Sequence, residues 1–215
     1  KRHSEDPNFV KRFYKEGKAA AQLNHPNIVH AYEVGQAGEH HFFVMEYVEG
    51  SDVREEIKEK KRLPEDAAIE IMIQSAKALE HAHSKGLIHR DIKPANIMLT
   101  RSGSVKVADL GLARSVDDTA LAKEEEGRAY GTANYMSPEQ IRGKVDIGPP
   151  ADIYGLGATC YNMVTGKNPF TGKTPSDVMR GHLKTPLRAP DELNPMLSPG
   201  FCQIIEMCMG KELSD

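Results

Sequence analysis

The stretch from His89 to Leu99, HRDIKPANIML, places polar and charged residues between two apolar segments of the chain. Asp91 and Asn96 are five positions apart with Lys93 between them, so a compact loop can aim an acid, a cation and an amide at one point. Such groups are costly to hold between buried walls unless hydrogen bonds or a ligand satisfy them. The stretch therefore predicts a functional site built into a folded core.

Length and composition agree with a fold that has such a core. The 215 residues are 39% hydrophobic, enough for one large domain or two small lobes. A net charge of −3 gives no general attraction to nucleic acid or to an anionic membrane, and no apolar run is long enough to span a bilayer. The three cysteines have neither disulfide nor zinc-site spacing. We therefore expect a cytoplasmic protein, with no nucleic-acid partner and no membrane segment in this chain.

The first part of the chain combines one helix with two strands. Asp6-Pro7 is typical of a helix start, and one stripe of that helix comprises Phe9, Phe13, Glu16, Ala20 and Leu23. Two strand-like runs follow over residues 28–34 and 41–48. Residues 49–52 break the pattern, and we expect a linker or hinge there.

The remainder is mostly helical. Helices are expected from Leu63-Pro64 to Gly86 and over residues 153–164, 175–182 and 199–210. Residues 96–100 and 105–108 are strand-like and are expected to pair as a hairpin, while 110–150 are expected to be mostly loop. A small β-containing part followed by a helical part predicts an α+β fold with two lobes.

The predicted hairpin has a chemical consequence. It returns the chain so that Asp109 lies near Asn96, and two hard oxygen ligands suit Mg²⁺ that shares its remaining sites with phosphate. Asp91 is then free to orient a hydroxyl and take its proton, and Lys93 offers a positive charge to a phosphoryl group. Positioning and electrostatics are most of what phosphoryl transfer needs. The residues therefore indicate a phosphoryl-transfer site.

Several ordered motifs resemble those of eukaryotic-type protein kinases. HRD at 89–91 with Lys93 and Asn96 is similar to the catalytic loop of that family. DLG at 109–111 resembles the metal-binding DFG triplet, with Leu in place of Phe, and SPE at 137–139 resembles the APE triplet that closes the activation segment. The phrases NHPNIV, DLGLARS and GTANYMSPEQ are most similar to bacterial serine/threonine members.

The resemblance implies roles in catalysis. It implies that Asp91 is the catalytic base and that Lys93 contacts the γ-phosphate of ATP. Asn96 and Asp109 are implied as ligands of Mg²⁺ or Mn²⁺. Thr132 matches the threonine that supports the base in the serine/threonine branch.

It also implies where the nucleotide lies. Met45 takes the gatekeeper position, and the backbone groups of Glu46 and Val48 in the hinge are expected to hydrogen-bond adenine. Asp52 is expected near the ribose, and Met98 in the apolar floor beneath the base.

A third group is implied to support the site. Glu16 resembles the helix-C glutamate that pairs with a lysine on the third strand, and Asp152 the buried acid that braces the catalytic loop. We expect His89 to be a packed residue that holds the loop rather than a base. Glu139 is expected to pair with an arginine beyond residue 215.

Arg90 raises a regulatory hypothesis. An arginine before the catalytic aspartate is typical of kinases whose activation segment is ordered by a phosphate. The acidic run that ends at Glu126 lies where bacterial relatives tend to carry that phosphate, so its carboxylates could partly replace it opposite Arg90. The simpler alternative is that these glutamates are solvated.

The resemblance divides the chain at the hinge. Residues 1–48 correspond to a partial N-lobe, helix C plus two strands, and residues 49–215 to a C-lobe that lacks its C-terminal end. The Gly-rich loop and the strand-three lysine are not in this sequence, so we expect the domain to be truncated at both ends and the segment alone to bind MgATP weakly. The whole protein could carry a membrane anchor.

The sequence therefore predicts a serine/threonine protein kinase that uses ATP and acts on protein hydroxyls, with a homodimer as a further possibility. One alternative is a small-molecule kinase of the aminoglycoside type, which Lys93, Gly131-Thr132 and Ser137-Pro138-Glu139 disfavour. The other is a pseudokinase or binding module. The intact catalytic residues argue against it for the whole protein, while the missing strand-three lysine leaves it open for this segment.

Overall fold

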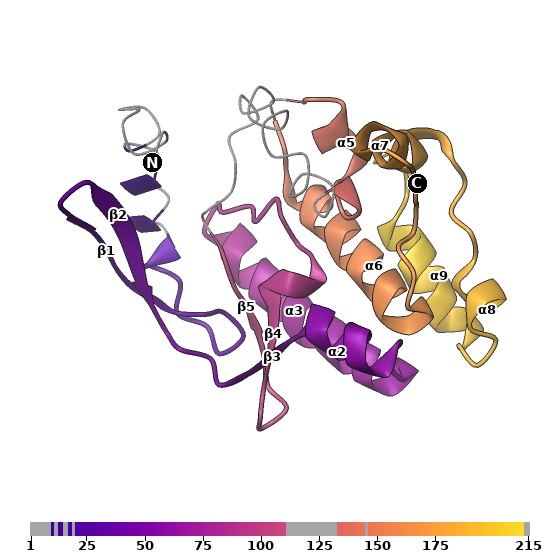
Figure 1. The fold of residues 1–215 in the computed structure, drawn as a ribbon, viewed down its shortest axis with the longest axis horizontal. Helices are drawn as coiled ribbons and strands as arrows, with labels where there is room; N and C mark the ends of the chain where they lie inside the picture. Colours follow the sequence, from indigo (N-terminus) through magenta and orange to yellow (C-terminus); the bar gives the residue numbers. More distant parts are fainter. Residues whose placement is uncertain are drawn as a thin grey trace.

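The computed structural model describes residues 10, 13–14, 17–18, 20–110, 133–144 and 146–212. A two-stranded sheet lies at one end, a three-stranded sheet with two helices lies in the middle, and further helices form the other end (Figure 1). The predicted α+β class, with early strands and a mostly helical remainder, is confirmed.

Strands β1 (Ala31–Ala37) and β2 (His40–Met45) form the two-stranded antiparallel sheet. The described residues between 10 and 20 have helical backbone, as the apolar stripe predicts. The ring of Phe13 in this helix lies 4.6 Å from that of Phe43 in β2. The helix therefore packs against the sheet through the stripe, of which Phe9 and Glu16 lie outside the described residues.

The three-stranded sheet has the order β3-β4-β5 and comprises β3 (Gly50–Asp52), β4 (Ile97–Thr100) and β5 (Val105–Val107). The predicted β4–β5 hairpin is confirmed. The prediction of a linker at residues 49–52 is wrong for β3, which pairs antiparallel with β4. Gly50 permits this pairing, because a Cβ there would lie 1.8 Å from the carbonyl oxygen of Leu99.

The helices form the rest of the described chain. They are α2 (Val53–Lys60), α3 (Glu65–Ser84), α5 (Pro138–Ile141), α6 (Pro149–Thr165), α7 (Pro175–Lys184), α8 (Pro190–Leu193) and α9 (Pro199–Cys208). The four predicted helices correspond to α3, α6, α7 and α9. Helices α2, α5 and α8 were not predicted, and α5 lies within residues 110–150, which were expected to be mostly loop. Asp52 and Glu55 form a capping box that marks the start of α2.

The main hydrophobic core lies where α3, α6 and α9 pack together (Figure 1). Leu79 of α3, Tyr161 of α6 and Ile205 of α9 are all buried in it. Helix α6 is buried over most of its surface, as its apolar sequence predicts. Its first turn carries Asp152, which contacts the polar loop.

We expect Gly50→Ala to lower the free energy of unfolding by about 2–4 kcal/mol, because the new Cβ would force β3 away from β4. Gly200→Ala is the matched control, since nothing lies within 4 Å of a Cβ at that position in α9. It should change stability by less than about 1 kcal/mol. Chemical denaturation of both variants checks the expectation, and equal losses would contradict it.

His182 of α7 is fully buried. Its Nδ1 lies 2.7 Å from the hydroxyl oxygen of Tyr154, and the ring packs edge-on against Phe170. Burial, aided by the nearby charge of Lys211, lowers the pKa of His182 to about 4 from 6.5. The imidazole is therefore neutral in the folded protein at pH values where the unfolded chain binds a proton.

Stability should consequently fall as the pH drops from about 6.5 to about 4, because only the unfolded state gains the proton in that range. The loss attributable to His182 is about 3 kcal/mol, since one pKa unit corresponds to about 1.4 kcal/mol. In His182→Asn, whose amide can still meet the Tyr154 hydroxyl, this part of the pH dependence should disappear. Denaturation curves across this pH range check it, and parallel profiles for the two proteins would contradict it.

Candidate active site

The polar loop between α3 and β4 is fixed by one carboxylate, that of Asp152 in the first turn of α6. Asp152 is 1% exposed, and its Oδ1 and Oδ2 accept hydrogen bonds from the backbone N–H groups of Arg90 (2.7 Å) and His89 (2.9 Å). His83 Nε2 in α3 lies 2.7 Å from Oδ2. The helix N-terminus favours the negative charge. A helix start thus holds the loop backbone that leads to Asp91.

The buried ring of His89 connects this loop to the segment after β5. Its Nδ1 accepts a hydrogen bond from the N–H of Asp91 at 3.3 Å, so Nε2 carries the proton and donates it to the carbonyl oxygen of Ala108 at 2.8 Å. Ala108 also donates its N–H to the carbonyl oxygen of Asn96 at 2.8 Å. These contacts bring the start of the 109–111 segment to the loop.

Asp91, Lys93 and Asn96 are in direct contact. Lys93 Nζ lies 2.5 Å from Asp91 Oδ2, and Asn96 Nδ2 donates to Asp91's carbonyl oxygen at 2.8 Å and to Oδ2 at 3.3 Å. Asn96 belongs to a single 3₁₀ turn (Pro94–Asn96) and is buried. Its amide therefore steadies the acid, while Asn96 Oδ1 receives no hydrogen bond from a described residue.

Asp109 follows Ala108 with a left-handed backbone, φ 60°, and its side chain is exposed. Few residues other than glycine take this conformation, which turns the chain sharply at the end of the sheet. Its carboxylate makes no hydrogen bond with a described residue. The Asp109 carboxylate and Asn96 Oδ1 are hard oxygen donors of the kind that a divalent cation bound to phosphate prefers, so the donor set fits such an ion. No cluster of three His, Cys, Asp or Glu side chains suited to a metal occurs among the described residues.

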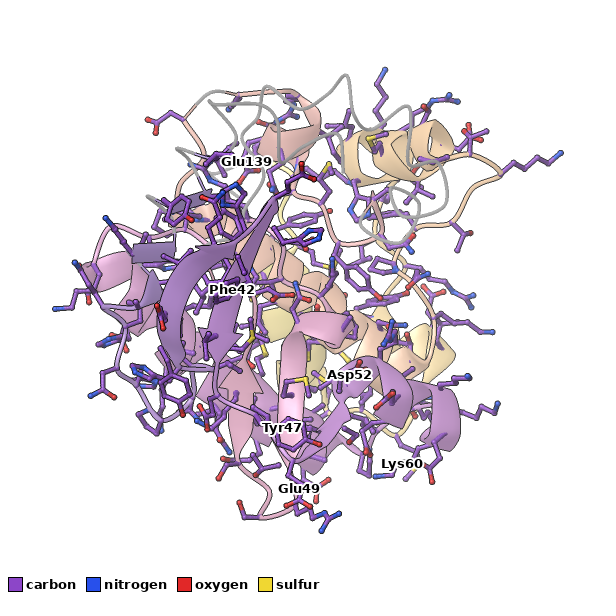
Figure 2. The ribbon with its side chains drawn as sticks, turned by 60° about the vertical axis from the view of Figure 1, so that its left-hand side comes forward. Phe42, Tyr47, Glu49, Asp52, Lys60 and Glu139 are labelled. Atoms are coloured by element: carbon purple, nitrogen blue, oxygen red, sulfur yellow. The ribbon has the colours of Figure 1, made fainter. Side chains whose placement is uncertain are left out.

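The hinge positions lie between β2 and β3. Glu46 donates its N–H to the carbonyl oxygen of His30 at 2.8 Å, whereas the carbonyl of Glu46 and the N–H of Val48 make no hydrogen bond with a described residue. Tyr47 between them is 88% exposed and lies on the connection that runs from β2 towards α2 (Figure 2). Within the described part of the chain, the carbonyl of Glu46 and the N–H of Val48 are therefore open to a ligand.

Asp52 and Met98 face one another across the sheet, because they are paired residues of β3 and β4. Asp52 lies at the start of α2 (Figure 2), where its Oδ1 accepts from the N–H of Glu55 and its Oδ2 from Arg54, each at 2.8 Å. Both oxygens of Asp52 thus already accept hydrogen bonds, and its expected contact with a ribose stays a prediction. Met98 is half-buried beside it.

The remaining predicted residues are less completely placed. Glu16, Glu126 and Thr132 lie outside the described residues. Glu139 is buried in the first turn of α5 and has no side-chain partner among the described residues, so its pairing with a distant arginine stays a prediction. Arg90 Nε is buried and likewise lacks a partner in the described part of the chain.

Two supporting residues were missed from the sequence. His83 was given no role in the site from the sequence, but it contacts Asp152 from α3. Gln140 of α5 donates from Nε2 to the carbonyl oxygen of Arg90 at 2.7 Å. Neither contact has a local sequence signal, because the bonded residues are 69 and 50 positions apart in the chain.

The family pattern described as "Protein kinase domain" matches residues 1–215. The chain belongs to the protein kinase family. The predicted similarity to bacterial serine/threonine kinases is confirmed by several relatives. A probable serine/threonine-protein kinase of Streptomyces coelicolor, SCO3848, is 38% identical over 211 residues, covering 96% of this chain and 31% of the relative.

Two further relatives agree. The probable serine/threonine-protein kinase CPE1738 of Clostridium perfringens is 42% identical over 204 residues, 95% of this chain and 29% of its own length. Serine/threonine-protein kinase PknA of Mycobacterium tuberculosis is 38% identical over 213 residues, 97% of this chain and 48% of its own length. The chain therefore spans between 29% and 48% of these relatives. None of the described helices has the length and apolar character needed to cross a membrane.

We expect Asp152→Asn to lower the free energy of unfolding by about 2–4 kcal/mol and to reduce strongly the phosphoryl transfer that the loop residues indicate. The reason is that the amide of Asn has one acceptor oxygen, whereas two N–H groups of the loop donate to Asp152. Asp66→Asn is the matched control, an exposed acid in the first turn of α3. Its effect on stability should stay below about 1 kcal/mol. Denaturation and activity measured together check this, and similar results for both variants would contradict it.

Proposed function

We propose that the protein containing this chain is a serine/threonine protein kinase, which transfers the γ-phosphoryl group of ATP to Ser or Thr hydroxyls of protein substrates. The observation that carries the proposal is the contact of the Asp91 carboxylate with Lys93 and Asn96 on a loop anchored by Asp152. An acid, a cation and an amide are held together beside an exposed Asp109. The relatives are named serine/threonine-protein kinases, which supports the substrate class.

Asp91 acts as the general base in this proposal. The hydroxyl of the protein substrate gives its proton to the carboxylate, its oxygen forms a bond to the γ-phosphorus, and the bond to the β-phosphate oxygen breaks as ADP leaves. Lys93, 2.5 Å from Asp91 Oδ2, compensates charge on the transferring group. Asn96 holds Asp91 in place through two hydrogen bonds.

Membership of the protein kinase family implies ATP and a divalent metal ion. In this chain Asn96 Oδ1 and the Asp109 carboxylate would hold the metal, Mg²⁺ or Mn²⁺. The ion, when bound, neutralises charge on the phosphates. Asp109 is exposed and Asn96 Oδ1 is free of described donors, so neither residue has to break a contact to serve.

The base of ATP would lie against the hinge. The carbonyl of Glu46 and the N–H of Val48 make no hydrogen bond with a described residue, and Met98 of β4 is placed beneath them in the proposed site. The hinge also marks the proposed boundary between an N-lobe part, residues 1–48, and a C-lobe part, residues 49–215. Roles for Glu16, Thr132 and the other supporting residues stay part of the proposal.

We expect Asp91→Asn in the complete protein to lower kcat by about 10³-fold or more, because an amide cannot accept the proton. The KM for ATP should change by less than about threefold, since Asp91 acts on the hydroxyl and not on the nucleotide. Transfer of labelled phosphate to a generic protein substrate measures both constants.

Asp191→Asn provides the control for this test, because Asp191 is an exposed acid in α8 and should leave both constants unchanged. Two results would overturn the proposal. Transfer to an aminoglycoside but to no protein would indicate a small-molecule kinase, and nucleotide binding without any transfer would indicate a binding module.

A further inference from the structure

An ion pair connects the two sheets of the structure. Glu46 follows the end of β2, Lys106 is the middle residue of β5, and Glu46 Oε2 lies 2.9 Å from Lys106 Nζ. The same Oε2 accepts a hydrogen bond from the backbone N–H of His30 at 3.2 Å. Among the ion pairs formed by the described residues, this pair alone joins the β1–β2 sheet to the β3–β4–β5 sheet.

The pair is better shielded from water than an ordinary surface ion pair. The side chains of Lys106 and Glu46 are 17% and 26% exposed, whereas those of Arg101 and Glu49, also 2.9 Å apart, are 78% and 61% exposed. Exposed pairs contribute little because water screens them. Burial alone would raise the pKa of Glu46, but the hydrogen bonds from Lys106 and His30 outweigh it and hold that pKa below its usual value.

Both partners lie beside proposed nucleotide contacts. The carbonyl of Glu46 is a proposed contact of adenine. Lys106 lies in β5, three positions before Asp109, a proposed metal ligand. The neighbouring Val107 is hydrogen-bonded to the segment that leads into β1, through its N–H to Asn27 (2.8 Å) and its carbonyl to Val29 (2.9 Å). Glu46–Lys106 adds a side-chain ion pair to this junction, where Asn27 Nδ2 also donates to the carbonyl oxygen of Val105 at 2.8 Å.

We propose that Glu46 and Lys106 form a positioning clamp, which sets the spacing between the adenine-binding backbone of the hinge and the Asp109 end of the site. The clamp therefore acts on affinity for the nucleotide rather than on the rate of phosphoryl transfer. This inference rests on the proposed function. It concerns residues that act through others, because neither side chain is assigned a contact with ATP.

Lys106→Met removes the charge and keeps most of the side-chain volume. Exposed ion pairs contribute little energy and the loss of one partner of a buried pair costs much, and this pair lies between the two cases. We therefore expect the KM for ATP and the Kd for ADP to rise about tenfold. The value of kcat should stay within about threefold. Lys106→Arg, which preserves the charge, should restore at least half of the lost affinity on a logarithmic scale.

A double-variant cycle tests whether the two residues act together. Glu46→Gln should raise the KM by a similar factor, and Glu46→Gln combined with Lys106→Met should raise it no more than the larger single effect. Arg101→Met is the matched control, since it breaks an exposed pair of the same length, and it should leave both constants unchanged.

Amide hydrogen exchange without nucleotide tests the clamp independently of activity. Protection of the Glu46 N–H, which bonds to His30, should fall at least about tenfold in Lys106→Met, while protection of Leu79 in α3 stays as in the unsubstituted protein. Loss of protection at both sites would mean general destabilisation and would overturn the clamp.

The outcomes separate the clamp from the proposed function. Unchanged affinity and unchanged Glu46 protection in Lys106→Met, additive effects in the double variant, or a change confined to kcat would each overturn the clamp. Absence of phosphoryl transfer by the unsubstituted protein would overturn the proposed function instead, and the hydrogen-exchange result would still decide whether the pair fixes the hinge.

Discussion

The carboxylate of Asp152 holds the backbone from which the proposed catalytic groups project. Each of its two oxygens accepts a backbone N–H of the loop, and His83 adds a contact from α3. Because an unpaired buried carboxylate is costly, the loop and the helices are bound to one arrangement. Asp91 thereby acquires a fixed position, which its hydrogen bonds to the buried residues His89 and Asn96 reinforce.

A second set of contacts relates this loop to the start of the 109–111 segment. His89 and Asn96 each bond to the backbone of Ala108, one through a ring nitrogen and the other through a carbonyl oxygen. These bonds use only backbone groups of Ala108, and the carboxylate of the next residue, Asp109, bonds to none of the described residues. The site is thus held by the hydrogen bonds that Asp152, His89 and Asn96 make with the loop and with Ala108.

Much of the fold follows from local patterns. The helices α3, α6, α7 and α9 were predicted because apolar periodicity and terminal Gly or Pro residues are properties of adjacent positions. The β4–β5 hairpin was predicted for the same reason. Strand β3 was missed because its pairing depends on the edge of β4, some 50 positions away, and helix α2 because its apolar content is low although its capping box is visible.

The sequence by itself determined the family, the α+β class and the identity of the charged residues in the loop, because ordered motifs and periodicity are written along the chain. Only the tertiary structure decided which side chains are hydrogen-bond or ion-pair partners. It showed that both oxygens of Asp52 are already used, that His83 supports Asp152, and that Glu46 pairs with Lys106 across two sheets. Such contacts depend on how distant segments pack, and neither spacing nor composition encodes them locally.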